Sequence, residues 1–334
     1  MICKRHFMLT AKYCQFILFN GQKCYFSRMN NAQKEFKDKF PSGLVDEPLS
    51  RYCTFLVGGP ADMLYRAQNT TDIPELISFA KAQEIPYLII GGGSNLLFDD
   101  KGFRGLVIKI ECRRINIDGD EITADSGVTV AELLNFSIRN GLSGLEKWIG
   151  LPGTVGGAVR GNAGCNGLET KEVIVKATIL SSETGETREV DNEYFEYDYR
   201  TSLLKETGEI VLNATFKLAN TSISKEEQLK VMQEIKQFRQ QAQPYGSSSG
   251  SFFKNPSLEQ PAGMLIDQAG LKGKTVNKTQ ISEKHGNFLL NLGGATSEDI
   301  KELANLAKQE VKAKFDIELE EEVQILDEYG KTKL

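Results

Sequence analysis

Two glycine-rich stretches carry the residues best suited to bind a ligand through the backbone. The first, "GGGSNLLF" at 91–98, leaves backbone N–H groups free to approach a phosphate, and Ser94 and Asn95 add side-chain donors. It is not a P-loop, because no Gly-Lys-Ser/Thr follows. It is not a Rossmann fingerprint either, because Leu96 stands where GxGxxG needs glycine. Taken alone, this stretch fits either phosphate binding or a tight structural turn.

The second stretch, "GLPGTVGGAVRGNAGCNG" at 150–167, has seven glycines in 18 residues. Glycine costs stability inside a helix or strand, and a disordered linker would not carry Leu151, Pro152, Val155 and Val159. We interpret it as backbone that lies against a flat or extended ligand. "FLVGGPAD" at 55–62 supplies a third close-approach turn. The loops suit a dinucleotide whose pyrophosphate meets one stretch and whose ring system meets the other.

A third stretch, "YGSSSGSFFKNPS" at 245–257, joins two different compositions. Its first half resembles a flexible linker. Its second half contains Phe252, Phe253, Lys254 and Asn255, which a linker does not need. The stretch fits either a domain joint or the wall of a site that requires one particular hydroxyl.

Helical and strand patterns alternate along the rest of the chain. Ser224 and Glu227 form a capping box that predicts a helix to about residue 241. Ile300, Leu303, Ala307 and Val311 predict another helix over 297–314 by their spacing. Further predictions are a helix starting at Thr71 or Asp72, a buried strand at 85–90, a helix at 128–140, antiparallel strands at 173–180, 186–190 and 209–218, and a short strand at about 321–326.

Length and composition indicate a globular chain of two or three domains. The chain has 334 residues, of which 40% are hydrophobic and 25% charged. Composition changes near residue 220, where "LANTSIS" leads from strands into a helix. We therefore expect one domain over 45–220 and an α+β domain over 221–330.

Charge and cysteine usage exclude several classes of function. The net charge is −5, and residues 1–34 contain no acid, so the rest of the chain is more acidic still. An acidic body argues against nucleic-acid binding, and anionic substrates would need local Lys and Arg. Six cysteines without a CxxC pair, together with two histidines, argue against a zinc site and for a reducing compartment. We expect no metal.

The basic extension at 1–34 has three open interpretations. Its apolar run Cys14–Phe19 is too short to cross a bilayer, so we expect no membrane span. The extension is a start site placed too early, with Met29 as the true initiator, or a disordered basic tail, or an organelle transit peptide. We exclude it from the fold and expect it to be disordered.

Eight motifs in order give the chain a family resemblance. "TFLVGGPAD", "GGGSNLL", "LPGTVGGAV-GNAG", "YRTS", "GSFFKNP", "LIDQAGLKG", "SEKHGNFLLN" and "EEEVQI" resemble those of the UDP-N-acetylenolpyruvylglucosamine reductases over about residues 45–326. The resemblance implies an α+β fold: an FAD-binding domain of the PCMH or vanillyl-alcohol-oxidase type with two α/β subdomains, then an α+β substrate-binding domain. It also explains FAD binding without GxGxxG.

The resemblance implies a cytoplasmic, NADPH-dependent FAD oxidoreductase of peptidoglycan precursor synthesis, and so of cell-wall biogenesis, cell shape and division. Its small-molecule partner would be a UDP-sugar. NADPH reduces FAD, and reduced FAD saturates the enolpyruvyl group to give UDP-N-acetylmuramate. Negative charge then develops beside a carboxylate. Such a site needs a cation, a positioned proton donor and fixed dipoles.

Three residues match the catalytic positions of the family. Arg200 in "YDYRTS" would hold the carboxylate, since a guanidinium grips it as a fork and stays charged. Ser251 in "GSFFKNP" would be the proton donor. Glu322 in "EEEVQI" would assist stabilisation and protonation. Because alternate residues of a strand share a face, we expect Glu320 and Glu322 to point one way and Glu321 the other.

The resemblance also assigns cofactor and substrate contacts. Lys254, Asn255, Arg239 and Gln243 match positions near the diphosphate and sugar, and His285 and Asn287 are further substrate candidates. The residues expected to bind FAD lie in the three glycine stretches: Gly58, Gly91, Gly92, Gly93, Ser94, Asn95, Pro152, Gly153, Thr154, Gly156, Gly157, Asn162, Ala163 and Gly164.

The chain departs from the family pattern at several positions. Gln324 stands where the family usually has arginine, two residues after the glutamate, which puts diphosphate affinity in doubt. "VRGN" and Cys165-Asn166 also differ, and we expect Cys165 to be a small filler near the flavin. Between about 200 and 221 there is no tyrosine-bearing insertion, which indicates the shorter subtype. Two alternatives stay open: an FAD-dependent sugar or alcohol oxidase, and a flavin-binding protein without turnover.

Overall fold

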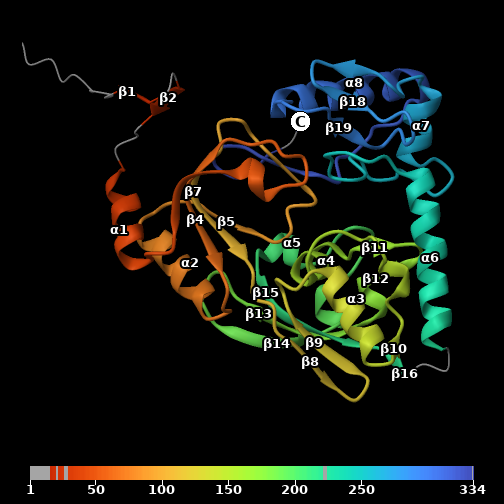
Figure 1. The fold of residues 1–334 in the computed structure, drawn as a ribbon, viewed down its shortest axis with the longest axis horizontal. Coiled ribbons are helices and arrows are strands. Elements are labelled where there is room, and N and C mark those ends of the chain that lie inside the picture. The colour runs from red at the N-terminus through yellow and green to blue at the C-terminus, as the bar shows by residue number, and fades with distance from the viewer. Residues whose placement is uncertain (1–15, 20–21, 26–28, 221–223, 333) are drawn as a thin grey trace, which may run out of the picture. The chain divides into compact units, whose positions relative to one another are not determined.

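The computed structural model describes residues 16–19, 22–25, 29–220, 224–332 and 334, in two compact units, Met1–Pro41 and Ser42–Leu334 (Figure 1). In the first unit β1 (Phe16–Phe19) pairs antiparallel with β2 (Gln22–Tyr25), and α1 (Asn31–Lys39) begins at a capping box of Asn30 and Gln33. The expected disorder of residues 1–34 falls largely outside the described ranges and stays a prediction.

The second unit begins with a four-stranded mixed sheet. In spatial order its strands are β3 (Leu44–Pro48), β4 (Pro60–Ala67), β7 (Phe103–Ile110) and β5 (Tyr87–Ile90). The predicted helix is α2 (Asp72–Ala82), and its apolar face is buried. The prediction of a buried strand at 85–90 was partly wrong. β5 is shorter, and three of its four residues are only half-buried, because it lies at the edge of the sheet.

The central part of the unit contains a five-stranded antiparallel sheet, which confirms the three predicted strands. The spatial order is β14 (Thr187–Asp191), β13 (Ile174–Leu180), β15 (Ile210–Lys217), β9 (Glu121–Asp125) and β8 (Ile115–Asp118). Side chains of α3 (Val130–Arg139) and α4 (Val155–Gly161) join those of the sheet in one apolar core. The smaller elements are α5 (Leu204–Thr207) and the strand pairs β10 (Leu142–Ser143) with β16 (Ala219–Asn220) and β11 (Gly164–Cys165) with β12 (Leu168–Glu169).

Four single-turn 3₁₀ helices complete this unit's regular structure ahead of the C-terminal part. They span Leu49–Tyr52, Glu146–Trp148, Thr170–Glu172 and Glu193–Phe195.

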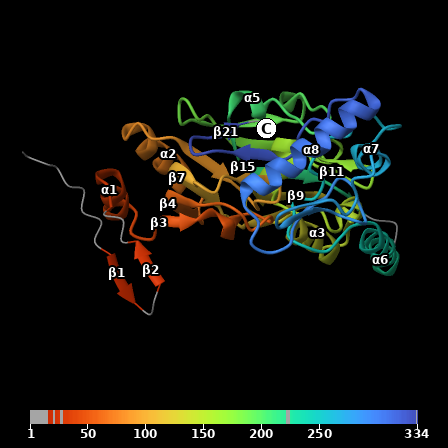
Figure 2. The same ribbon diagram turned by 90° about the horizontal axis from the view of Figure 1, so that it is seen from above.

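The C-terminal part is α+β, as predicted. The long helix α6 (Lys225–Ala242) begins at the Ser224–Glu227 capping box and runs along the margin of the unit in both views (Figures 1 and 2). α7 (Ala262–Gln268) and the small sheet β17 (Thr275–Val276), β18 (Thr279–Ile281) and β19 (Leu289–Asn291) follow. α8 (Ser297–Phe315) has its predicted apolar face fully buried. Each Leu, Ile or Val in that face contributes about 1.5–3 kcal/mol.

A strand from the first part of the unit pairs with strands near residue 325 in a second small sheet. β6 (Leu96–Phe98) follows the first glycine stretch and pairs in parallel with β20 (Gln324–Leu326), which also pairs with β21 (Lys331–Thr332). One apolar core contains residues of the first sheet, such as Leu64, and residues of the C-terminal part, such as Phe252 and Ile325. The predicted domain boundary at 220/221 borders residues 221–223, which lie outside the described ranges, and it stays a prediction.

No helix among the described residues is both long enough and apolar enough to span a bilayer.

Candidate active site

The two glycine-rich stretches lie against each other. Residues 91–95 connect β5 to β6, and residues 152–154 lead into α4. A Cβ atom at Gly92 would lie 2.9 Å from Cα of Gly153, and one at Gly91 would lie 2.4 Å from Oγ1 of Thr154. Neither position has room for a side chain. The structure thus brings together the two loops that the sequence singled out for ligand binding.

The turn at 55–62 packs against β6, and the end of α4 is held by the side chain of Asn162. A Cβ atom at Gly58 would lie 2.6 Å from Cβ of Phe98, on β6. Asn162 is fully buried, and its side-chain amide donates to Oε2 of Glu169 (2.9 Å) and to the carbonyl of Asp198 (3.0 Å). Its side-chain oxygen accepts from the backbone N–H of Lys171. A cofactor contact at Asn162 would therefore use the backbone.

Asn95 connects the first glycine loop to the segment that carries Glu322. Its side-chain amide donates to the Glu322 carbonyl at 2.9 Å, and its own carbonyl accepts from the backbone N–H of Gln324 at 3.0 Å. The parallel pairing of β6 with β20 continues from this point. The glycine loop and the candidate catalytic glutamate are therefore fixed relative to each other.

Arg200 and Glu322 form an ion pair. Arg200 Nε lies 2.9 Å from Glu322 Oε1, and the side chains are only 25% and 20% exposed. Burial raises the pKa of Glu322, although the positive charges of Arg200, Lys205 and Lys254 lower it. Arg200 also lies over the ring of Tyr199, at 5.4 Å from its centroid. The structure thus brings two of the three predicted catalytic residues into contact.

The backbone of Arg200 has a φ of 56°, in the left-handed region that costs a non-glycine residue free energy. The Lys205 ammonium donates a hydrogen bond to the Arg200 carbonyl. Strained backbone of this kind persists only where the surrounding structure holds it. The strained backbone at Arg200 indicates that the fold holds this side chain in one particular position.

The acidic run divides among three partners. Glu320 is exposed and pairs with Lys254 at 2.6 Å, Glu321 pairs with Lys308, and Glu322 pairs with Arg200. The predicted strand at 321–326 was too long, because β20 begins only at Gln324. Glu321 nevertheless forms an antiparallel bridge with Phe253, so the run is extended ahead of β20. Lys254 pairs with Glu320 and also acts on the charge of Glu322, whereas Glu321 pairs with Lys308, which agrees with the expected alternation.

Ser251 lies on an extended segment that is hydrogen-bonded on both sides. The N–H of Phe252 donates to the Asn287 carbonyl and the N–H of Lys254 to the Glu320 carbonyl, each at 2.8 Å. The Phe252 carbonyl in turn accepts from the N–H of Glu322. Phe252 and Phe253 are buried in the core. The serine is therefore held on a rigid support next to the Glu322 segment.

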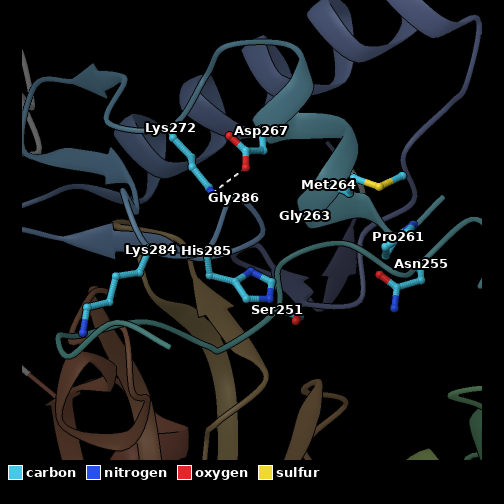
Figure 3. Close-up of a pocket in the computed structure, with 10 residues that line it drawn as sticks. All are labelled: Ser251, Asn255, Pro261, Gly263, Met264, Asp267, Lys272, Lys284, His285 and Gly286. Atoms are coloured by element: carbon cyan, nitrogen blue, oxygen red, sulfur yellow. Dashed lines mark hydrogen bonds and ion pairs between the residues drawn. The ribbon is translucent and has the colours of Figure 1, made fainter. Parts of the chain in front are cut away.

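A cavity of about 310 Å³ opens beside Ser251. Figure 3 shows the serine close to the imidazole of His285, with Lys272 and Lys284 on other parts of the lining. Burial lowers the pKa of His285, and the charge of Lys272 lowers it further. The cavity thus combines a hydroxyl, an imidazole, the cation of Lys284 and an ion pair between Lys272 and Asp267.

A second cavity, of about 220 Å³, is lined by Arg200, Tyr199, Cys165 and the end of the glycine stretch. Asn255 lines both cavities, and its side-chain oxygen accepts from the backbone N–H of Ala262 at 3.1 Å. The two cavities therefore meet at Asn255. Ser251 opens into one of them and Arg200 into the other.

Arg239 connects α6 to the glycine-rich stretch. Its guanidinium donates to Sγ of Cys165 at 3.1 Å and to the Gly150 carbonyl at 2.9 Å. Burial raises the pKa of Cys165, although Arg239 and Arg200 lower it, so the thiol stays protonated. A protonated, half-buried thiol fits a filler role better than a nucleophile. Gln243 ends α6, and its N–H donates to the Arg239 carbonyl.

Asn287 supports the serine segment. It is buried, its side-chain oxygen accepts from the N–H of Phe253 at 2.9 Å, and its amide donates to the Phe253 carbonyl at 2.8 Å. Asn287 was predicted to contact substrate. These bonds show a structural use of its side chain, and its substrate contact stays a prediction.

Asn287→Ala is expected to lower the free energy of unfolding by about 2–4 kcal/mol, because it leaves a buried N–H and a buried carbonyl without partners. Denaturant unfolding would measure the loss. Asn140→Ala is the matched control: Asn140 is exposed and makes one side-chain bond, to the Phe136 carbonyl. Equal losses in the two variants would contradict the support role.

Sequence reasoning missed several residues of the site. Arg160, Lys205, Lys272 and Lys284 lie beside the candidate catalytic residues or line the larger cavity. Of these residues, only Arg160 was noticeable in the sequence, because it lies in "VRGN", which departs from the family pattern. The lysines stand in ordinary polar segments, and only the fold brings them to the site.

Lys205→Met is expected to stabilise the protein at pH 7 by about 1–3 kcal/mol. Burial lowers the pKa of Lys205 to about 8, helped by the charges of Arg160, Lys254 and Lys331 and opposed by Glu322. The native state therefore carries a costly cation below pH 8. The native side chain loses its proton near pH 8 and the unfolded one near pH 10.5. The destabilisation by Lys205 therefore shrinks as the pH rises from 8 to 10.5 and is absent above that range.

The gain from Lys205→Met should accordingly shrink when unfolding is measured at pH 9.5 instead of pH 7. Lys230→Met, at an exposed position on α6, is the control and should change stability by less than about 0.5 kcal/mol at either pH. A gain that is the same at both pH values would show that Lys205 is not the titrating group.

Comparison with known proteins gives independent assignments for both parts of the second unit. Residues 61–191 match the family described as "FAD binding domain". Residues 240–326 match "UDP-N-acetylenolpyruvoylglucosamine reductase, C-terminal domain". The predicted fold, a flavin domain followed by an α+β domain, is confirmed.

The relatives are similar over nearly their full length. The chain is 38% identical over 303 residues to the UDP-N-acetylenolpyruvoylglucosamine reductase of Bacillus velezensis, covering 89% of this chain and 99% of that protein. It is 39% identical over 287 residues to that of Bacillus subtilis, covering 85% and 93%. The crystal structure of UDP-N-acetylenolpyruvylglucosamine reductase from Thermus caldophilus is 34% identical, covers 85% of this chain and 97% of that one, and has a TM-score of 0.72. With identities above 30% over more than two thirds of each chain, this protein belongs to the UDP-N-acetylenolpyruvoylglucosamine reductase family.

Proposed function

We propose that this protein reduces UDP-N-acetylenolpyruvylglucosamine to UDP-N-acetylmuramate, with FAD as bound cofactor and NADPH as reductant. The observation that carries the proposal is the Arg200–Glu322 ion pair, which Asn95 holds against the glycine loop of the flavin domain. A carboxylate-binding cation thus lies next to the loop expected to hold the cofactor. Family membership supports the same activity.

The glycine loops fit FAD. They approach each other through glycine backbone and the hydroxyls of Ser94 and Thr154, so backbone N–H groups and small hydroxyl donors are gathered where a cofactor would lie on the main chain. Below α4, the hydroxyl of Ser126 is buried and has no partner within the described residues, and a Cβ atom at Gly156 would lie 2.8 Å from Cβ of Ser126. Residues 91–95 and 152–157 would hold the cofactor. When bound, FAD takes a hydride from NADPH and supplies it to the enolpyruvyl group.

The roles of the side chains follow from their chemistry. Arg200 binds and orients the substrate carboxylate and stabilises the negative charge that develops beside it. Ser251 donates the proton that completes the reduction, since its rigid support can hold the hydroxyl at one carbon. Glu322 aligns the guanidinium and, with its raised pKa, exchanges protons at the reacting end of the site.

The UDP group and sugar are assigned to the two cavities where they meet at Asn255. Lys254, Asn255, Arg239 and Gln243 contact the diphosphate and sugar in this proposal, together with His285. Lys284 adds positive charge to the lining of the larger cavity, whereas Lys272 is paired with Asp267. The free thiols of Cys53, Cys112 and Cys165 support a reducing, cytoplasmic location.

Anaerobic flavin spectroscopy tests the function. NADPH should reduce the bound flavin without substrate, and the enolpyruvyl substrate should reoxidise it. Reduction by a sugar or alcohol in place of NADPH would favour the oxidase alternative. Flavin that NADPH reduces and the enolpyruvyl substrate does not reoxidise would exclude the proposed activity.

A further inference from the structure

Two cations beside the Arg200–Glu322 pair have no acidic partner. Arg160, in the last turn of α4, donates to Oε1 of Gln324 at 3.3 Å. Lys205, on α5, donates to the Arg200 carbonyl. Within the part of the chain that the structure describes, neither side chain has a carboxylate within 4.0 Å. Both are half-buried.

The local charge is therefore unbalanced. Glu322 pairs with Arg200 and Glu320 with Lys254, which leaves Arg160 and Lys205 without an ion-pair partner of their own, although the charge of Glu322 partly offsets that of Lys205. Burial lowers the pKa of Arg160, so the environment is costly for its charge. Cations are seldom kept partly out of water without a partner. An anion that enters the site would remove this cost.

Arg160 contacts the two chain segments that carry Arg200 and Glu322. Its carbonyl accepts a hydrogen bond from Oγ of Ser202 at 2.7 Å, and Ser202 is two residues after Arg200. Its guanidinium meets Gln324, two residues after Glu322, and the Gln324 N–H is bonded to Asn95. The guanidinium thus lies between the two chain segments that carry the ion pair. The amide oxygen of Gln324 gives it a fixed orientation without neutralising it.

We propose that Arg160 and Lys205 form a second oxyanion-binding site beside the Arg200–Glu322 pair, that Gln324 orients the Arg160 guanidinium, and that the site binds an oxyanion of the substrate. This inference rests on the proposed function. The ligand is a carboxylate or diphosphate oxygen, because a guanidinium fork and an ammonium both donate several hydrogen bonds and accept none. Gln324 then serves as the acceptor that positions a cation supplied from α4.

The test measures binding of the enolpyruvyl substrate to the oxidised holoenzyme by calorimetry, without NADPH. Arg160→Gln should weaken binding by about 10- to 100-fold, because it removes a charged hydrogen-bond donor. Arg160→Lys, which keeps the charge and loses the fork, should restore part of the affinity. The double variant Arg160→Gln with Gln324→Arg exchanges the two side chains of the Arg160–Gln324 hydrogen bond, so the guanidinium comes from position 324. This variant should recover most of the lost substrate affinity. Arg113→Gln, in a surface ion pair with Glu132, is the control and should bind like the parent protein.

UDP-N-acetylglucosamine, which has the diphosphate and lacks the enolpyruvyl carboxylate, distinguishes the two sources of the oxyanion. Weaker binding of the enolpyruvyl substrate alone assigns the carboxylate, and equal weakening of both ligands assigns the diphosphate. Both results support the site. The flavin content of each variant is measured alongside. Unchanged substrate affinity in Arg160→Gln, or loss of flavin with unchanged substrate affinity, overturns the inference. Failure of the parent protein to turn over the substrate counts against the proposed function instead.

Discussion

Ser251→Ala is expected to leave reduction of the flavin by NADPH intact and to slow its reoxidation by the enolpyruvyl substrate about 10²- to 10⁴-fold. The hydroxyl is the proposed proton donor, and alanine removes it with little change of volume. The segment around it is bonded to residues on both sides through the backbone, so the support should survive. Anaerobic stopped-flow measurement would give the rates of flavin reduction by NADPH and of flavin reoxidation by substrate separately.

Neighbouring serines supply the controls for Ser251. Ser249 is buried, and its hydroxyl has no partner among the residues described, so it is the strongest competitor within the same run. Ser248 accepts a hydrogen bond from the Gly250 N–H at 3.4 Å. Both alanine variants should reoxidise at nearly the parent rate. If Ser249→Ala is slow and Ser251→Ala is fast, the proton donor has been assigned to the wrong serine.

Arg200→Met is expected to lower kcat/KM for the enolpyruvyl substrate about 10²- to 10⁴-fold. Two effects combine. The substrate carboxylate loses its cation, and Glu322 is left as a half-buried carboxylate without its partner. Because Arg200 lowers the pKa of Glu322, its removal raises that pKa further above the usual value. Any part of the pH–rate profile that reports Glu322 should therefore move to higher pH.

Two comparisons make the Arg200 result specific. Arg200→Lys keeps a positive charge without the fork, so its kcat/KM should lie between those of the parent protein and Arg200→Met. Arg113→Met removes an arginine from a surface ion pair and should leave kcat/KM unchanged. An Arg200→Met enzyme with normal kcat/KM would show that Arg200 does not act on the substrate.

The sequence predicted local structure well where the signal was itself local. Ser224 with Glu227 marked the start of α6, and the spacing of Ile300, Leu303, Ala307 and Val311 identified the buried face of α8. Both signals depend on residues within one or two turns of helix. The motif order was equally informative about the family, because each motif is a contiguous segment.

Features that depend on tertiary contacts were not predictable in the same way. The partners of the acidic run, Lys254, Lys308 and Arg200, come from three other parts of the chain, and the run itself does not identify them. The 85–90 strand was assigned to the interior from its apolar composition, and its place at the sheet edge follows from the strand order alone. Lys205 reaches the site through the fold, and nothing in its own segment indicated a role.

The pairing of β6 with β20 has a consequence for the order of events during synthesis. A ribosome makes the glycine loop and β6 long before it makes β20. Domains tend to fold as they are made, but Asn95 acquires its two bonds to the Glu322–Gln324 segment only when that segment has been released. We therefore expect the flavin-binding part of a nascent chain to be incomplete until β20 has emerged, and pulse-labelled chains should become able to retain flavin only after that point.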